Sequence, residues 1–467
     1  MMSKHHSAGR HFWFVLWVAS LAERQPRLYL SISVLVMLLG YAFLVLFPFL
    51  VIEGVSVLAR QLPHVKTAEH WIVVEVWFAL LLFFLFFSQQ IFQLRFPRVK
   101  GLKLSKELAP GLYELIAAMR KYSPRPSIRS IVLTDQYELR IEETPRFGYP
   151  FWTTYTLIIG LPMLQTLTEE QLRGEVLRRL CQYSSGRFRP SHWLFRTRLL
   201  WRKYLDAMSH RKRFGETPMR WVFSVYVPFF EMLTLPAARM DELEADGAVL
   251  EWLNDRDYFE VIKSSAIAKL FLDAHYWRKV QQSALKNPDT ELSPFGKLEH
   301  VSGHLKSKDF RRKCLQYSLE AEQDFHEVMP CLRTRMENIG QSTLREVPVV
   351  EKTAAEACLG EARKNYVPLI DKLWRSTTLA DWKADYAARC ADYRKAKELS
   401  RKSRQQWLSF KEMLCYARLA KQLRGDSMQK SLWKALKRNL KNILPEGMSR
   451  YVFQRKVPVS RQANDIL

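Results

Sequence analysis

Two long apolar runs near the start of the chain restrict its fold more than any other feature. The 25 residues from Leu28 to Ile52 include no charged side chain, and the 19 residues from Val76 to Leu94 form a second uncharged run behind Glu75. A helix needs about 20 apolar residues to cross a hydrocarbon layer about 30 Å thick, and a cleaved signal peptide has a shorter apolar core. We therefore expect a membrane hairpin over residues 28–94, with spans at 28–52 and 71–94; two buried core helices are the alternative.

The Lys and Arg residues around these runs predict how the hairpin is oriented. Four precede the first run, two lie between the runs, and five follow the second run within residues 95–106. Short loops rich in Lys and Arg stay on the cytoplasmic side. We expect an integral membrane protein of two spans, located in a bacterial inner membrane, with both termini cytoplasmic. In the cytoplasmic segment 1–27, Phe12–Ala19 is expected at the membrane interface.

The remainder of the chain has the composition of a folded protein. With 48% hydrophobic and 25% charged residues, it is neither a disordered chain nor a collagen. Its six cysteines form no CxxC pair, which indicates reduced thiols rather than a disulfide framework. The length of 467 residues leaves room for two or three folded units.

Local patterns after the hairpin predict helices with a few strands between them. Thr168 and Gln171 have capping-box spacing and mark the start of a helix that continues through Tyr183. The 14-residue apolar stretch Trp221–Thr234 is too short to span a bilayer, so it is expected as a buried or membrane-facing helix. Beyond Val350 the chain is expected to be helical. The other expected elements are helices over Leu108–Met119 and Met240–Leu253, and strands over Ser130–Thr134 and Tyr155–Ile159, with a turn-rich connector at Thr144–Pro150.

One segment carries a family resemblance. Tyr155–Gly186, which reads YTLIIGLPMLQTLTEEQLRGEVLRRLCQYSSG, resembles the core of the HtpX-type membrane zinc metallopeptidases, peptidase family forty-eight. In that family a strand ending in GLP precedes a helix with an HExxH motif. The two His side chains bind zinc from one face of the helix, and the Glu activates a metal-bound water.

Two later segments extend the resemblance to about residues 28–340. The segment AARMDELEAD places Glu242 at the position of the third zinc ligand and Asp246 at that of a supporting Asp. Residues 329–340 are similar to a further family segment, with Met329 where His is usual. The resemblance implies an α+β, mostly helical fold: a gluzincin-like metallopeptidase domain with a small sheet at 95–345, then a basic helical extension at 346–467.

The central motif departs from the family pattern. Aligned without gaps, HExxH falls on Arg178-Arg179-Leu180-Cys181-Gln182, so both His ligands and the catalytic Glu are absent, and no HExxH occurs elsewhere in the chain. A guanidinium is always charged and has no lone pair for a metal. We therefore expect no intact catalytic residue and no metal or cofactor, with Glu242 as a vestigial ligand position and Asp246 as its support. Zinc is expected only if the chain has a non-standard site.

Arg178 can take the place of the missing cation. Without a metal, Glu242 and Asp246 would be two uncompensated carboxylates, which is costly if they are buried. A guanidinium between them would neutralise both through charge-assisted hydrogen bonds. We expect Arg178 to pair with Glu242 or Asp246; the alternative is that Arg178 and Arg179 are ordinary exposed helix residues.

The end of the chain is strongly basic. From Ser400 to Leu467 there are 16 Lys and Arg against 4 Asp and Glu. In Met428–Ile443, Leu side chains share one helical face and basic side chains occupy the rest, a pattern typical of helices on an anionic membrane surface. A solvated helix packed on its neighbours is the alternative, and nucleic acid is an unlikely partner. The expected membrane-surface residues are Lys430, Trp433, Lys434, Lys437, Arg438 and Lys441.

Together these features predict a membrane-anchored, catalytically inactive pseudopeptidase. Its expected partners are the lipid bilayer and a protein or peptide at the cytoplasmic face, where an edge strand near Tyr155–Ile159 could bind an extended peptide. One alternative is an active zinc metalloendopeptidase in membrane protein quality control, with a non-standard site. The other is a membrane-tethered module that binds anionic lipid or nucleic acid through the basic end of the chain.

Overall fold

The computed structural model divides the chain into two compact units. Unit 1 comprises residues 1–269 and 299–370, and unit 2 comprises residues 270–298 and 371–467. The described residues are 2–64, 68–97, 99–123, 126–146, 149–185, 189–209, 216–284, 293–301, 305, 307–324, 327–340, 350–405 and 408–422.

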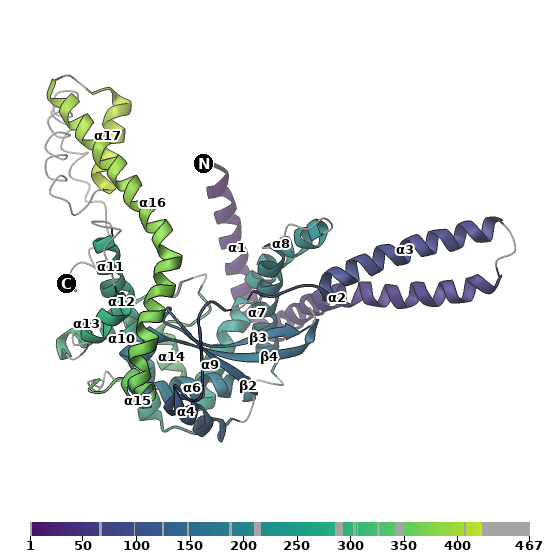
Figure 1. Ribbon diagram of the computed structural model, residues 1–467, viewed down its shortest axis with the longest axis horizontal. Helices are drawn as coiled ribbons and strands as arrows, with labels where there is room; N and C mark the ends of the chain where they lie inside the picture. The colour runs from purple at the N-terminus through teal and green to yellow at the C-terminus, as the bar shows by residue number, and fades with distance from the viewer. Residues whose placement is uncertain are drawn as a thin grey trace. The chain divides into compact units, whose positions relative to one another are not determined.

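Two long helices of unit 1 form the predicted hairpin. They are α2 (Pro26–Gln61) and α3 (Ala68–Phe92), and α1 (Met2–Arg24) precedes them. Where they pair, Phe47 stacks on Phe87 with ring centroids 5.2 Å apart. Both helices are long and apolar enough to cross a membrane, and only 17% and 11% of their apolar windows are buried. This low burial argues against the alternative of two core helices, because core helices would bury most of these side chains. Figure 1 shows the hairpin extending away from the rest of unit 1.

The sheet is small and mixed. Its strands are β1 (Leu102–Leu104), β2 (Ile128–Thr134), β3 (Leu139–Arg146) and β4 (Tyr149–Gly160), in the order β1-β2-β4-β3. β2 and β4 are parallel, whereas the other two pairs are antiparallel. The two predicted strands lie within β2 and β4, which confirms them.

Two sequence-based expectations about this sheet are wrong. The turn-rich connector Thr144–Pro150 is mostly strand: Thr144–Arg146 belong to β3 and Tyr149–Pro150 to β4, and both prolines fit because strand pairing continues around them. The strand at Tyr155–Ile159 is not an edge, because β4 lies between β2 and β3. An extended peptide therefore cannot add to β4.

Helices of unit 1 lie beside the sheet (Figure 1), and α5 and α6 contact β4 and β3. The capping box that predicts the start of α6 is confirmed: the Gln171 amide donates to Thr168 Oγ1 at 3.2 Å, and the Thr168 amide donates to Gln171 Oε1 at 3.0 Å. The other predicted helices overlap α4, α8 and α9, and their predicted ends differ from the observed ends by one to five residues. The helices of unit 1 are α4 (Pro110–Arg120), α5 (Leu161–Thr166), α6 (Glu169–Ser185), α7 (Pro190–Ser209), α8 (Glu216–Leu233), α9 (Leu235–Val249), α10 (Asp255–Leu270), α13 (Lys308–Glu320), α14 (Leu332–Asn338) and α15 (Ala354–Cys358).

One apolar core joins the hairpin to the helices of unit 1. Tyr29, Met37 and Leu44 of α2 are buried in the same cluster as Trp201 of α7 and Phe223 of α8. Because these side chains come from both the expected span and the expected domain, the first half of α2 is part of the folded body of unit 1.

Unit 2 is helical and is held by aromatic side chains. Trp374 lies with its ring centroid 5.7 Å from Trp277 and 4.8 Å from Trp382, and Phe295 packs on Trp277 at 5.6 Å. The described part of the chain after Val350 is helical apart from short connections, as predicted. The elements of unit 2 are a π-helical turn (Phe271–Tyr276), α11 (Trp277–Ala284), most of α12 (Pro294–Val301), most of α16 (Arg363–Gln405) and α17 (Phe410–Gln422).

Candidate functional site

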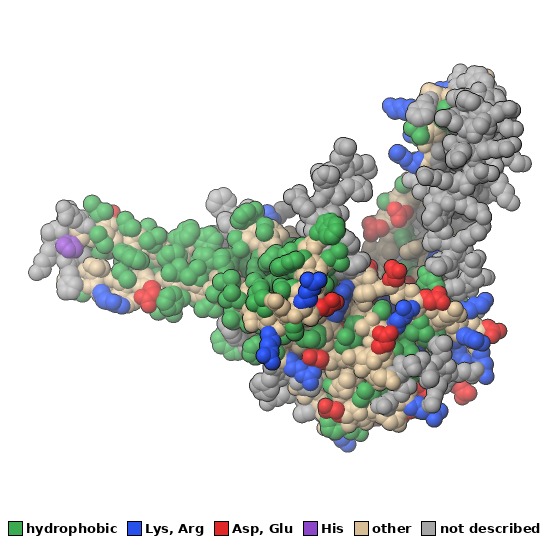
Figure 2. All heavy atoms as spheres, turned by 180° about the vertical axis from the view of Figure 1, so that it is seen from behind, with side chains coloured by type: hydrophobic (Ala, Val, Ile, Leu, Met, Phe, Trp, Pro, Cys, Tyr) green, Lys and Arg blue, Asp and Glu red, His purple; other side chains and the backbone are tan. Residues whose placement is uncertain are grey.

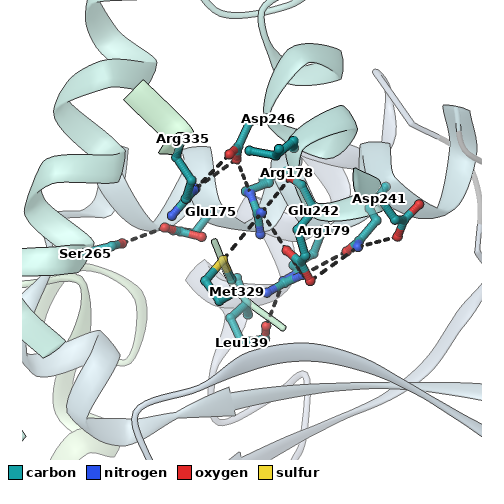
Figure 3. Close-up of polar contacts among 12 residues, drawn as sticks. Leu139, Glu175, Arg178, Arg179, Asp241, Glu242, Asp246, Ser265, Met329 and Arg335 are labelled. Atoms are coloured by element: carbon teal, nitrogen blue, oxygen red, sulfur yellow. Dashed lines mark hydrogen bonds and ion pairs between the residues drawn. The ribbon is translucent and has the colours of Figure 1, made fainter. Parts of the chain in front are cut away.

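The residues singled out by the degenerate motif come together between α6 and α9. These two helices pack against each other, so Arg178, Arg179 and Gln182 of α6 face the acidic side chains of α9. Figure 3 shows Arg178 and Arg179 converging on Glu242, with Asp246 on the other side of Arg178.

Arg178 lies between the two carboxylates that it was expected to neutralise. Its Nη2 donates to Glu242 Oε2 at 2.6 Å and to the Glu242 carbonyl oxygen at 3.0 Å, and its Nε donates to Asp246 Oδ1 at 2.6 Å. The side chain is 1% exposed. The predicted ion pair is therefore confirmed, and it involves both carboxylates rather than one. The alternative of an exposed Arg178 is wrong.

Asp246 collects donors from three further helices. Arg335 of α14 donates from Nε to Oδ2 and from Nη2 to Oδ1, each at 2.8 Å, and the Tyr258 hydroxyl of α10 donates to Oδ1 at 2.6 Å. Together with Arg178, these contacts saturate a fully buried carboxylate. Asp246 thus ties α6, α10 and α14 to α9.

Arg179 and Gln182 complete the arrangement on the other side of Glu242. Arg179 Nη1 donates to Glu242 Oε1 at 2.9 Å and to Gln182 Oε1 at 2.8 Å. Gln182 Nε2 donates to Asp241 Oδ2 at 2.8 Å, and His192 Nδ1 lies 3.1 Å from Asp241 Oδ1. Among these groups, Arg178, Arg179 and Arg335 balance the three carboxylates, because three positive and three negative charges sum to zero.

Helices α6 and α7 cover the β3 edge of the sheet. The Gly160 amide donates to the Glu138 carbonyl at 2.8 Å, so alternate peptides of β3 face β4 and those of Leu139, Ile141 and Glu143 face outward. The carbonyl oxygens of these three residues accept hydrogen bonds: Leu139 from Arg179 Nε (3.1 Å), Ile141 from the Tyr183 hydroxyl (3.0 Å) and Glu143 from Lys203 Nζ (2.7 Å). A peptide adding to this edge would have to displace all three side chains.

The electrostatics keep both central carboxylates ionised. Burial alone would raise the pKa of Glu242, but the charges and hydrogen bonds of Arg179 and Arg178 outweigh it and lower that pKa to about 2. Burial opposes ionisation of Asp246 as well, and Arg178 and Arg335 overcome it, so the pKa of Asp246 lies well below its ordinary value of 3.8. Both carboxylates therefore carry charge at neutral pH.

We expect acid to destabilise unit 1. The Glu242 pKa is lower in the folded chain than its ordinary value of 4.5, so its contribution is complete above about pH 4.5 and is lost as the pH falls toward about 2. Asp246 acts in the same direction. A depression from 4.5 to about 2 corresponds to a loss on the order of 3 kcal/mol. Chemical unfolding of the detergent-solubilised chain between pH 6 and about pH 2 measures this loss. The variant Glu242→Gln should show a shallower pH dependence, and an equal slope in both proteins would contradict the assignment.

The residues present do not fit a zinc ion. Zinc needs deprotonated nitrogen, sulfur or oxygen atoms as ligands. Arg178 and Arg179 present only N–H hydrogen-bond donors to Glu242 and offer no lone pair. Burial raises the pKa of Cys181 to about 12, which disfavours the thiolate that would bind a metal. Within the described ranges there is no group of three or more His, Cys, Asp or Glu side chains that could hold a metal.

Sequence reasoning missed several members of this site. His192 was not connected to it and Tyr258 was not considered, because they lie on α7 and α10 and no local spacing links them to the motif. Asp241 was not connected to it either, although it stands next to Glu242 in the sequence. Arg335 was noted only as part of a family segment. The expected membrane-surface residues lie outside the described residues: Lys430, Trp433, Lys434, Lys437, Arg438 and Lys441.

Comparison of the chain with protein-family models, curated proteins and solved structures finds no match. The interpretation of the site therefore rests on its residues and on their geometry.

Proposed function

We propose that this chain is a membrane-anchored, catalytically inactive relative of the HtpX-type zinc metallopeptidases, which acts by binding protein partners at the cytoplasmic face. The observation that supports this proposal most strongly is the position of Arg178, hydrogen-bonded to both Glu242 and Asp246. In the resembling family the first zinc ligand stands at this position of the helix. Here the space is filled by a side chain that neutralises the same carboxylates.

The chemistry of the neighbouring groups argues against hydrolysis. A peptidase of this type needs a metal to polarise water and a carboxylate to take its proton. Arg179 stands where that carboxylate would be, and it cannot accept a proton because its guanidinium is always charged. We therefore favour a binding role over the alternative of an active endopeptidase. Since the outward carbonyls of β3 are already engaged, we infer that a partner binds elsewhere than at this edge.

The zinc content of the purified chain tests this proposal. We expect the full-length protein to contain no stoichiometric zinc by elemental analysis, and a variant with Arg178→His, Arg179→Glu and Gln182→His to bind about one zinc per chain. The three changes place two imidazoles one helical turn apart and free Glu242 from both arginines, which supplies three zinc ligands. Circular dichroism should first establish that the variant is folded.

A matched variant separates a rebuilt site from a simple pair of histidines. Glu169 and Arg173 are one turn apart on the partly exposed face of the same helix. Replacing both by His should give no stoichiometric zinc, because that face offers no third ligand. Stoichiometric zinc in the unaltered protein, together with chelator-sensitive cleavage of a protein substrate, would overturn the proposal in favour of the endopeptidase.

A further inference from the structure

Helix α8 is apolar on both of its faces. Phe223, Val227 and Phe230 are buried in the core of unit 1, whereas Trp221 and Val225 on the opposite face are 68% and 60% exposed. A helix at the surface of a water-soluble domain normally turns polar side chains outward. A helix that is apolar all round is covered on its outer face as well, either by protein or by lipid.

Helix α1 enlarges this exposed apolar surface. Its Phe14 packs against Phe229 of α8 with ring centroids 5.6 Å apart, so the two helices are neighbours. On the outer side of α1, Trp13 and Trp17 are 70% and 57% exposed. Tryptophan is the residue most typical of membrane interfaces, because its ring is apolar and its N–H is polar.

The register between α8 and α2 places this surface beside the first membrane span. Near the end of α8, the Tyr29 hydroxyl donates to the Leu233 carbonyl at 3.0 Å. Midway, the Tyr226 hydroxyl donates to the Val36 carbonyl at 2.8 Å. Near the start of α8, Phe223 contacts Phe43 at 6.1 Å between ring centroids. α8 therefore runs antiparallel to residues 29–43 of α2, within the uncharged run 28–52.

The side chains of α2 make the apolar surface continuous. Leu35, Leu38 and Leu39 are 60%, 53% and 60% exposed along the stretch that α8 accompanies. Figure 2 shows hydrophobic side chains covering the α2–α3 hairpin and continuing onto the adjoining part of unit 1. Contiguous exposed apolar surface of this kind marks a contact with protein or membrane.

We propose that α8 and α1 insert into the bilayer leaflet through which α2 enters the membrane, and that lipid acyl chains cover their exposed faces. This occupant follows from continuity with the two helices that are apolar enough to span a membrane. It does not depend on whether the site between α6 and α9 is catalytic.

The chain leaves the lipid at the end of α8 rather than crossing the bilayer. α8 and α9 meet at a 53° bend. α9 then carries the buried acidic side chains of the ion-pair site, so it belongs to the protein interior. At this end of α8, Glu231 pairs with Arg202 at 2.9 Å. Basic side chains at the ends of α1, α2 and α3 can reach lipid headgroups from the ends of their aliphatic stems: Arg24, Arg27 and Arg95.

Spin labels on the full-length chain in lipid vesicles test the proposal. In a background where the partly exposed Cys331, Cys390 and Cys415 are replaced by Ser, a nitroxide at Val225→Cys would be compared with two reference positions. Leu82→Cys lies on the exposed face of α3, and Glu170→Cys lies on the water-facing side of α6. Oxygen concentrates in acyl chains, whereas a nickel chelate stays in water. We expect a ratio of oxygen to nickel collisions at position 225 within about twofold of that at 82, and several-fold above that at 170.

Each other outcome would overturn the lipid assignment. A collision ratio like that of position 170 would mean that α8 faces water. Low collision rates with both agents, with spin–spin broadening between labels, would mean that a second copy covers the face. Low rates without broadening would mean that another part of the same chain covers it. A label at Trp17→Cys provides an independent position if Val225→Cys prevents folding, and the same ratio is expected there.

Discussion

Replacing Arg178 by Met should lower the free energy of unfolding of unit 1 by about 3–5 kcal/mol, because it leaves buried charge without a partner. Arg178 is 1% exposed and reaches both Glu242 and Asp246 at 2.6 Å. Without it, Asp246 keeps Arg335 and Glu242 keeps Arg179, but three carboxylates then face only two guanidinium groups. Denaturant unfolding of the detergent-solubilised chain, monitored by circular dichroism, measures the loss.

A variant on the outer face of the same helix controls for the loss of an arginine as such. Arg173 pairs with Glu169 at 2.9 Å, and the two side chains are 43% and 42% exposed. Arg173→Met should cost less than about 1 kcal/mol, since exposed pairs contribute little. Adding Glu242→Gln and Asp246→Asn to Arg178→Met should recover part of the stability, because the uncompensated charge is then removed. A loss of less than about 1 kcal/mol in Arg178→Met would contradict the role given to this side chain.

Replacing Gly160 by Ala should also destabilise unit 1 severely, by about 3 kcal/mol. Gly160 ends β4 and precedes α5, and its backbone passes close to the turn between β2 and β3. A Cβ atom there would lie 1.7 Å from the Gln136 carbonyl oxygen and 2.9 Å from the Glu138 nitrogen. Both are backbone atoms, so no side-chain rotation can relieve the overlap. The unfolding midpoint of the variant in detergent is the measurement.

Gly247 provides the matched control for this substitution. It lies within α9, and a Cβ atom added to it would have no neighbour within 4 Å among the described residues. Gly247→Ala should therefore raise the stability by about 0.5–1 kcal/mol, because alanine favours helix. If the two alanine variants had the same stability, the close approach at Gly160 would not be the cause of its effect.

The features that could be predicted from sequence alone are those that depend on residues close together in the chain. The apolar runs indicate the hairpin because a span has to be continuous, and the Thr168–Gln171 spacing marks the start of α6 because a capping box is local. The pairing of Arg178 was predictable for a different reason. Once Glu242 and Asp246 are expected to lie close together without a metal, a positively charged side chain is needed beside them, and few residues could supply it.

The features that were missed depend on contacts between distant residues. Thr144–Pro150 has the composition of a turn, yet pairing with β4 holds most of it in strands, so tertiary structure overrides local propensity. The order β1-β2-β4-β3 cannot be obtained from strand positions alone, which is why β4 was taken for an edge. The contact between His192 and Asp241 joins residues 49 positions apart and has no sequence signal.

The shared core of α2 and α8 has a consequence for how the chain is made. The hydrogen bond between Tyr29 and Leu233 joins residues separated by 204 positions. At a synthesis rate of about 5–20 residues per second, roughly 10–40 seconds pass between the emergence of the two partners from the ribosome. During this interval the apolar side of α2 that later contacts α7 and α8 has no protein to cover it. Early insertion into the membrane would shelter this surface from water and from other nascent chains. Once α8 is synthesised, its side chains would replace the lipid in contact with α2.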